Sequence, residues 1–146
     1  MSRIYFAYGS NMNVEQMGVR CPTARRIGTG VIHGYRLLFK GCNGRAVATI
    51  EPFEKAFVPI VIWSIEPADE RSLDRYEGFP TLYNKEHFEA DLGGDNRLPG
   101  MAYVMVKNYS TALPSEGYFN TILDGYDDNG IDVKSLFEAL SISSSK

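Results

Sequence analysis

Segments with the composition of β-strands follow one another closely along this chain. Three of them are residues 28–41 (GTGVIHGYRLLFKG), 46–50 (AVATI) and 56–65 (AFVPIVIWSI). Residues 83–106 (YNKEHFEADLGGDNRLPGMAYVMV) contain two more runs around a Gly-Gly-Asp-Asn segment, which is typical of a hairpin. Because the strands come mostly in succession, with helices inserted rather than strictly alternating, the sequence predicts an α+β fold.

The expected architecture is a small, mixed but mostly antiparallel β-barrel of about six or seven strands, flanked by helices. The helix with the clearest start and stop signals begins at Pro67 and ends before Gly78. It carries Asp69 and Glu70 in its first turn, where the helix dipole favours acids. The other predicted helices cover residues 14–19, 114–126 and 133–140. Residues 141–146, rich in serine, are expected to form a frayed tail.

Length and charge restrict the classes of protein to which the chain can belong. Its 146 residues are close to the commonest domain size, so we expect a single domain over residues 1–146. The 15 basic and 18 acidic residues give a net charge of −3, which offers no electrostatic footprint for nucleic acid or an anionic membrane. No apolar run approaches the roughly 18 residues that span a bilayer, and no signal pattern is present at the first residues. We therefore expect a cytoplasmic protein that binds neither nucleic acid nor membrane.

The first strand pattern, Ile4 to Tyr8, stops abruptly at the small residues Gly9, Ser10 and Asn11. Glycine permits a close approach that a side chain would prevent, and the Ser and Asn side chains can hold an irregular turn. A turn of this kind before a helix leaves backbone N–H groups without internal partners. Such groups suit a carboxylate or a developing oxyanion. The alternative is an ordinary strand-to-helix connection, since the same residues are common turn formers.

Glu77 is the second candidate. It lies four residues after Leu73 and on the same helix face, so it points inward if Leu73 is in the core. Burial and the negative end of the helix dipole would both raise its pKa, toward the range of a general base near neutral pH. The alternative is that the helix frays early and the carboxylate reaches water. Tyr83, on the strand that follows, could bring a hydroxyl to the same pocket.

Three motifs together resemble the γ-glutamylcyclotransferase family, which includes AIG2-like proteins. They are YFAYGSNM at residues 5–12, LDRYEG at residues 73–78 with Tyr83 six residues after Glu77, and NYSTALPSEGYFNTILDGYDDNGI at residues 108–131. The order and spacing are compatible with the family over nearly the whole chain.

The resemblance implies an enzyme that releases 5-oxoproline from small γ-glutamyl compounds without a metal or organic cofactor. It also implies a small mixed β-barrel flanked by helices, and a homodimer is plausible for the family. Glu77 would be the general acid/base. The substrate would be held by the loop residues Ala7, Tyr8, Gly9, Ser10 and Asn11 and by the pocket residues Tyr83 and Tyr118.

In the expected reaction the substrate supplies its own nucleophile, the α-amino group, which attacks the γ-carbonyl carbon. Glu77 would take a proton from the α-ammonium group and pass a proton to the departing amine. Ser10 is an alternative nucleophile, but no triad can be assembled around it from local motifs. The motifs do not specify whether the leaving group is an amino acid or an amine. A domain that binds γ-glutamyl or carboxylate ligands without turnover is the competing function.

Overall fold

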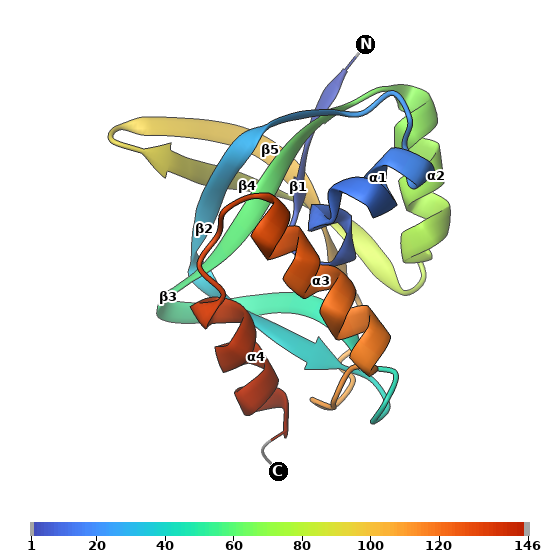
Figure 1. Cartoon of the computed structure of the whole chain (residues 1–146), viewed down its shortest axis with the longest axis vertical. Helices are drawn as coiled ribbons and strands as arrows, with labels where there is room; N and C mark the ends of the chain where they lie inside the picture. The colour runs from blue at the N-terminus through green and yellow to red at the C-terminus, as the bar shows by residue number, and fades with distance from the viewer. Residues whose placement is uncertain (1, 145–146) are drawn as a thin grey trace.

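The computed structural model describes residues 2–144 as a five-stranded closed barrel with helices packed around it (Figure 1). The strands are β1 (Arg3–Ala7), β2 (Arg25–Lys40), β3 (Val47–Ile65), β4 (Tyr83–Gly93) and β5 (Asn96–Met105). Around the barrel their order is β1-β3-β2-β4-β5. Every neighbouring pair is antiparallel except β1 and β5, whose parallel pairing closes the barrel at Tyr5 and Met101. The predicted α+β class and the mixed, mostly antiparallel barrel are confirmed.

The expected count of six or seven strands is wrong, because the runs at residues 46–50 and 56–65 belong to one long strand, β3. His33 on β2 lies opposite Phe57, but Tyr35 lies opposite Pro52, so residues 53–56 bulge out of the register. The backbone absorbs the bulge with a positive φ at Lys55. The polar residues that interrupt the hydrophobic pattern therefore mark a bulge rather than a break between strands.

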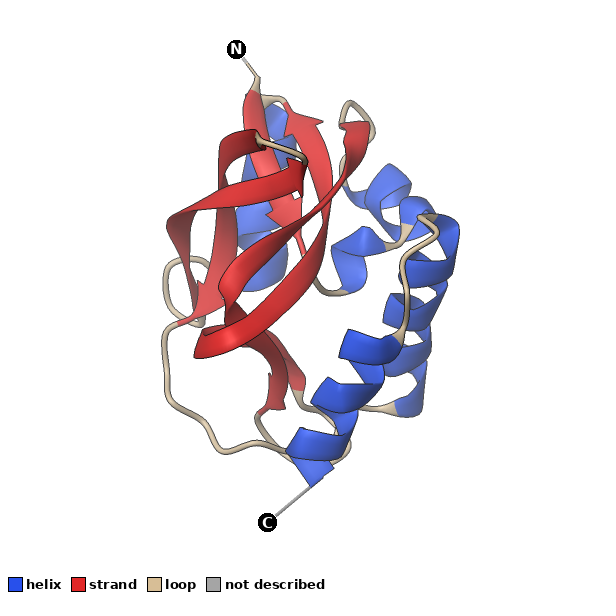
Figure 2. Ribbon diagram, turned by 90° about the vertical axis from the view of Figure 1, so that its left-hand side faces the viewer, coloured by secondary structure: helices blue, strands red, loops and turns tan. Residues whose placement is uncertain are grey.

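Four α-helices and one short 3-10 helix surround the barrel within residues 2–144. They are η1 (Ser10–Met12), α1 (Val14–Arg20), α2 (Pro67–Glu77), α3 (Glu116–Asp128) and α4 (Lys134–Ser144). In Figure 1, α3 and α4 lie in front of the strands, with α1 and α2 beside them, and Figure 2 shows the strands and the α3–α4 pair as adjacent layers. Among these residues no helix has the length and apolar character needed to cross a bilayer.

The expected frayed tail is wrong for residues 141–144, which form the last turn of α4. Ser143 is buried there, and its hydroxyl accepts a hydrogen bond of 2.9 Å from the backbone N–H of Phe39 on β2. This tertiary contact stabilises a turn that would be weak in isolation. Residues 145–146 lie outside the described part of the chain.

The segment that follows β1 is held between the barrel and α3. α3 approaches it at Gly125, where a Cβ atom would lie 2.8 Å from the backbone nitrogen of Asn13. Asn13 in turn caps α1, since its side chain accepts a hydrogen bond of 3.0 Å from the N–H of Gln16, as the sequence predicts. The turn at residues 9–12 is therefore fixed from both sides rather than by its own hydrogen bonds alone.

Candidate active site

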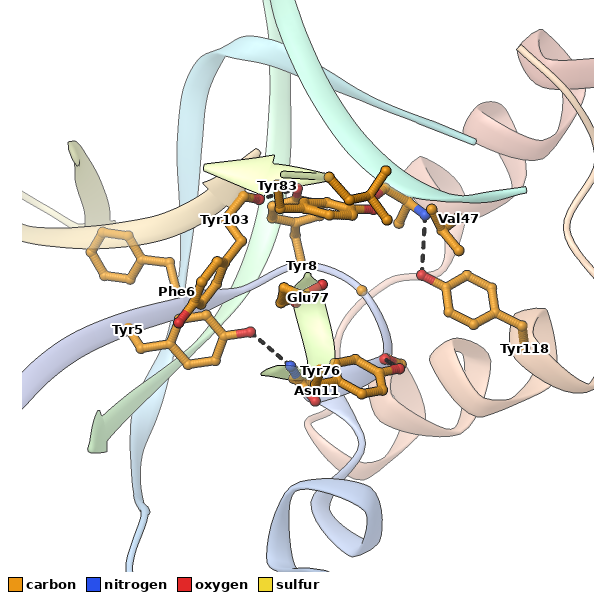
Figure 3. Close-up of a pocket in the computed structure, with 14 residues that line it drawn as sticks. Tyr5, Phe6, Tyr8, Asn11, Val47, Tyr76, Glu77, Tyr83, Tyr103 and Tyr118 are labelled. Carbon is orange, nitrogen blue, oxygen red and sulfur yellow. Dashed lines mark hydrogen bonds between the residues drawn. The ribbon is translucent and has the colours of Figure 1, made fainter. Parts of the chain in front are cut away.

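A small pocket opens between the loop after β1, the end of α2, the first residues of β3 and β4, and the first turn of α3 (Figure 3). Its volume is about 280 Å³, at the lower end of the range for small-molecule sites. It therefore suits a ligand of the size of a small metabolite. It is lined by Tyr5, Phe6, Tyr8, Gly9, Ser10, Asn11, Val47, Ala48, Tyr76, Glu77, Leu82, Tyr83, Tyr103 and Tyr118.

The contacts that cap the two ends of α2 fix the helix that carries Glu77. At the N-terminus Glu66 and Asp69 form a reciprocal capping box, and at the C-terminus Gly78 adopts the left-handed conformation with φ 66°. Leu73 is fully buried, and Glu77, one turn later, lies on the same face. Because the helix continues through Glu77, the alternative that it frays before this residue is wrong.

The environment of Glu77 changes its acidity. Burial raises the pKa of its carboxyl from about 4.5 to about 7, and the positive charge of Arg20 opposes part of this rise. Near neutral pH both the carboxylate and the carboxylic acid are therefore populated. A group in this state can both accept and donate a proton, which is what general acid–base catalysis requires.

The loop residues Gly9, Ser10 and Asn11 leave donors for a ligand. The carbonyl groups of Gly9 and Ser10 accept hydrogen bonds from the N–H groups of Met12 and Asn13, at 3.0 and 3.1 Å. Within residues 2–144, the N–H groups of Gly9, Ser10 and Asn11 themselves have no hydrogen-bond partner. Because all three residues line the pocket, these donors are available to a carboxylate or an oxyanion there.

Side chains hold this loop in place. The Ser10 hydroxyl is 2.7 Å from the Tyr76 hydroxyl, so the loop is bonded to the end of α2. The Asn11 amide donates a hydrogen bond of 2.9 Å to the Tyr5 hydroxyl, and the Trp63 indole N–H donates one of 3.0 Å to the Asn11 carbonyl. The loop is therefore pre-organised before any ligand binds.

Six of the lining residues are tyrosines, and three of these are hydrogen-bonded to strand backbone, two at Ala48 of β3 and one at Tyr103 of β5. The Tyr83 hydroxyl donates to the Ala48 carbonyl at 2.5 Å, and the Tyr8 hydroxyl donates to the Tyr103 carbonyl. The Tyr118 hydroxyl instead accepts from the Ala48 N–H at 3.0 Å, so its own proton is free to be donated into the pocket. Burial raises the pKa of Tyr8, Tyr83 and Tyr118 above its usual value, which keeps these hydroxyls protonated at neutral pH.

The sequence of this chain matches that of a known protein family. The family model described as "Gamma-glutamyl cyclotransferase, AIG2-like" matches residues 5–120. The chain belongs to this family. The resemblance expected from the three motifs is confirmed.

Individual proteins similar to this chain agree with the γ-glutamyl cyclotransferase family or share its fold. The human protein named gamma-glutamylcyclotransferase is 28% identical over 141 residues, which cover 91% of this chain and 74% of the human protein. A solved structure named gamma-glutamyl cyclotransferase has a TM-score of 0.82 at 25% identity, covering 100% of this chain and 89% of that one. The crystal structure of YkqA from Bacillus subtilis has the same fold, with a TM-score of 0.82 at 18% identity, covering 99% of this chain and 55% of YkqA.

The structure brings together seven of the eight site residues expected from the sequence of this γ-glutamyl cyclotransferase family member. Those that line the pocket are Tyr8, Gly9, Ser10, Asn11, Glu77, Tyr83 and Tyr118. Ala7 does not line the pocket, since it is the last residue of β1, pairs with Val61 and is buried in the core. The roles assigned to these residues stay predictions.

Several residues at the site were not among those expected. Tyr5 and Tyr103 line the pocket from β1 and β5, and Val47 and Leu82 add apolar surface. Arg20, at the end of α1, contacts the pocket residues Asn11 and Tyr76 from outside. Only the alternating pattern of the strands could have indicated the inward tyrosines, and no local pattern marks Arg20.

Proposed function

We propose that this protein is a cyclotransferase that converts a γ-glutamyl amino acid or amine into 5-oxoproline and the free amino compound. The observation that carries the proposal is the position of Glu77 in the lining of a small pocket, with its pKa raised to about 7, beside a loop whose N–H donors have no hydrogen-bond partner within residues 2–144. The names of the human relative and of the similar solved structure support the same chemistry.

The reaction forms one bond and breaks one. The substrate α-nitrogen forms a bond to the γ-carbonyl carbon, and the bond from that carbon to the leaving nitrogen breaks when the tetrahedral intermediate collapses. The α-nitrogen gives up two protons in all. The Glu77 carboxylate takes the first from the α-ammonium group and delivers it to the leaving nitrogen. After the new bond forms, Glu77 passes the second proton from the attacking nitrogen to the departing amine, which is released as an ammonium ion. Glu77 thus returns to its starting state, and the reaction requires no side-chain nucleophile.

The remaining residues would bind and orient the substrate. The N–H groups of Gly9, Ser10 and Asn11 would receive the developing oxyanion or the α-carboxylate, and the free proton of the Tyr118 hydroxyl would add a further donor. The pocket would also hold the γ-glutamyl chain in a curled conformation. Well-oriented intramolecular reactions gain roughly 7–11 kcal/mol from such proximity.

The test is to incubate the protein with a panel of γ-glutamyl amino acids and γ-glutamyl amines and to measure 5-oxoproline. The variant Glu77→Gln is expected to keep binding 5-oxoproline in calorimetry while kcat falls about 10²- to 10⁴-fold. Glu89→Gln, the same change at an exposed glutamate of β4, is the matched control and should keep full activity.

Each outcome has a clear meaning. Binding of 5-oxoproline without turnover of any substrate on the panel would favour the alternative of a non-catalytic binding domain. Turnover by the wild type with equal kcat for Glu77→Gln would show that Glu77 is not the base. Turnover of only amine or only amino-acid substrates would define the leaving group.

A further inference from the structure

Arg20 makes three contacts around the pocket without lining it. Its guanidinium carbon lies 3.5 Å from the centre of the Tyr76 ring. One terminal nitrogen donates a hydrogen bond to the side-chain oxygen of Asn11, and the other donates one of 3.1 Å to the side-chain oxygen of Gln16. The residue therefore links α1, the loop after β1 and the end of α2.

These contacts are to residues that define the site. Asn11 carries one of the unpartnered backbone N–H groups, and Tyr76 immediately precedes Glu77 in α2. Figure 3 shows Asn11 and Tyr76 together at one edge of the pocket, next to Glu77. The planar guanidinium can stack on an aromatic ring and donate in its own plane at the same time, which a lysine ammonium cannot do.

We propose that Arg20 is a positioning residue of this site, whose guanidinium fixes the Asn11 loop against the end of α2 so that the loop donors and Glu77 keep one relative geometry. The inference rests on the proposed function, because it assigns Arg20 to the geometry of that reaction. The Ser10–Tyr76 hydrogen bond is a second link between the same two segments, but it lacks a charge.

The charge of Arg20 also affects the pKa of Glu77, which can be measured separately from activity. The titratable groups that face Glu77 from the surrounding elements are Arg20 and the pocket tyrosines Tyr5, Tyr8, Tyr83 and Tyr118. The tyrosines are neutral near pH 7, because burial raises their pKa values. The charge of Arg20 lowers the pKa of Glu77 against the effect of burial, so removing it should move that pKa above about 7.

The experiment separates the charge from the geometry with two variants of the full chain. Arg20→Gln removes the charge and keeps an amide donor, whereas Arg20→Lys keeps the charge and removes the planar fork. Arg71→Met, which removes an exposed arginine from α2, is the matched control. The measurements are kcat and KM for 5-oxoproline release between pH 5 and 9, and the ¹³C NMR titration of the Glu77 carboxyl, assigned with Glu77→Gln.

Both variants are expected to lower kcat/KM, by about 10- to 100-fold, because small displacements of reacting groups have effects of that size. In Arg20→Gln the Glu77 titration and the acid limb of the activity profile should both move to higher pH, so the loss is larger at pH 7 than at pH 9. In Arg20→Lys the titration should stay near its wild-type position while KM rises. Arg71→Met should match the wild type in every measurement.

If Arg20 only stabilised the fold, Arg20→Gln would lower the melting temperature and leave the Glu77 titration in place. That result, or wild-type kcat/KM in both Arg20 variants, would overturn the proposal. If the wild type released no 5-oxoproline from any substrate, the proposed function would fail. The proposal for Arg20 would then fail with it as a statement about catalysis, while an unchanged NMR titration in Arg20→Gln would separately refute the link to Glu77.

Discussion

Replacing Glu77 with glutamine should stabilise the protein at neutral and alkaline pH while removing its activity. Glu77 is half-buried at the end of α2, in the lining of the pocket, where the charged form of its carboxyl loses solvation. Glutamine has nearly the same shape and stays neutral at every pH. The variant therefore avoids the free-energy cost of ionising a buried group and retains the packing around Leu73.

The size of the effect follows from the shift in acidity. The pKa of Glu77 is about 7 in the folded protein and about 4.5 when the side chain is solvated. Between these values the folded state keeps a proton that the unfolded state has lost, so the free energy of unfolding falls by about 1.4 kcal/mol for each pH unit. The full difference is about 3 kcal/mol, absent below about pH 4.5, complete above about pH 7, and equivalent to a rise in melting temperature of roughly 6–12 °C.

The assay is denaturant unfolding of the wild type and Glu77→Gln at intervals from pH 4 to pH 9, with Glu89→Gln as the control. The difference in unfolding free energy between the wild type and Glu77→Gln should be near zero at pH 4 and reach its plateau near pH 7. The exposed control should follow the wild type within about 0.5 kcal/mol at every pH. A difference that did not depend on pH, or a wild type more stable than Glu77→Gln at pH 8, would refute the claim that Glu77 is buried with a raised pKa.

Three further changes test the loop and its surroundings. Gly9→Val should raise KM about tenfold or more while the fold survives, because even a Cβ at Gly9 would lie 3.3 Å from the Ala48 Cβ and 3.5 Å from the Tyr118 hydroxyl; an unchanged KM would contradict this. Tyr118→Phe should lower kcat about 10²-fold with little change in melting temperature, and wild-type kcat would exclude the hydroxyl as an oxyanion donor. Ser10→Ala removes the bond to Tyr76 and should keep kcat within about tenfold, whereas complete loss would indicate a nucleophilic serine.

The fold could be predicted as far as its signals are local. Pro67 and Gly78 mark the start and the end of α2 within the local sequence, and in the structure the helix spans Pro67–Glu77. The predicted number of strands was wrong because the pairing of β2 with β3, and not the local sequence pattern, determines where β3 begins and ends. The bulge at residues 53–56 exists only because β2 and β3 remain paired on both sides of it, and a single strand's pattern contains no information about its partner.

The site residues likewise fall into those that the local sequence indicates and those that only tertiary contacts bring to the pocket. Glu77 was expected at the site because a carboxylate at its position contradicts what stability alone would favour, whereas the Gly9–Asn11 loop was expected from the abrupt end of the first strand pattern and from the family motif. Tyr103 was missed because it reaches the pocket only through the barrel, where β4 and β5 pair and β5 closes against β1. Arg20 was missed for a similar reason, since its contacts to Asn11 and Tyr76 span 9 and 56 residues of sequence.

A local contradiction with stability is therefore the most informative signal that this chain offers. A carboxylate one turn after a buried leucine, at the negative end of a helix, destabilises the protein at neutral pH by about 3 kcal/mol, the amount that follows from its raised pKa. Among residues 2–144, no ion pair is formed with this carboxylate. Arg20, stacked on Tyr76, lowers the pKa of Glu77 against the effect of burial and leaves it at about 7, so the carboxyl remains able to exchange a proton with a ligand. A fold optimised only for stability would have no reason to hold a carboxylate in this half-titrated state, whereas proton transfer at neutral pH requires it.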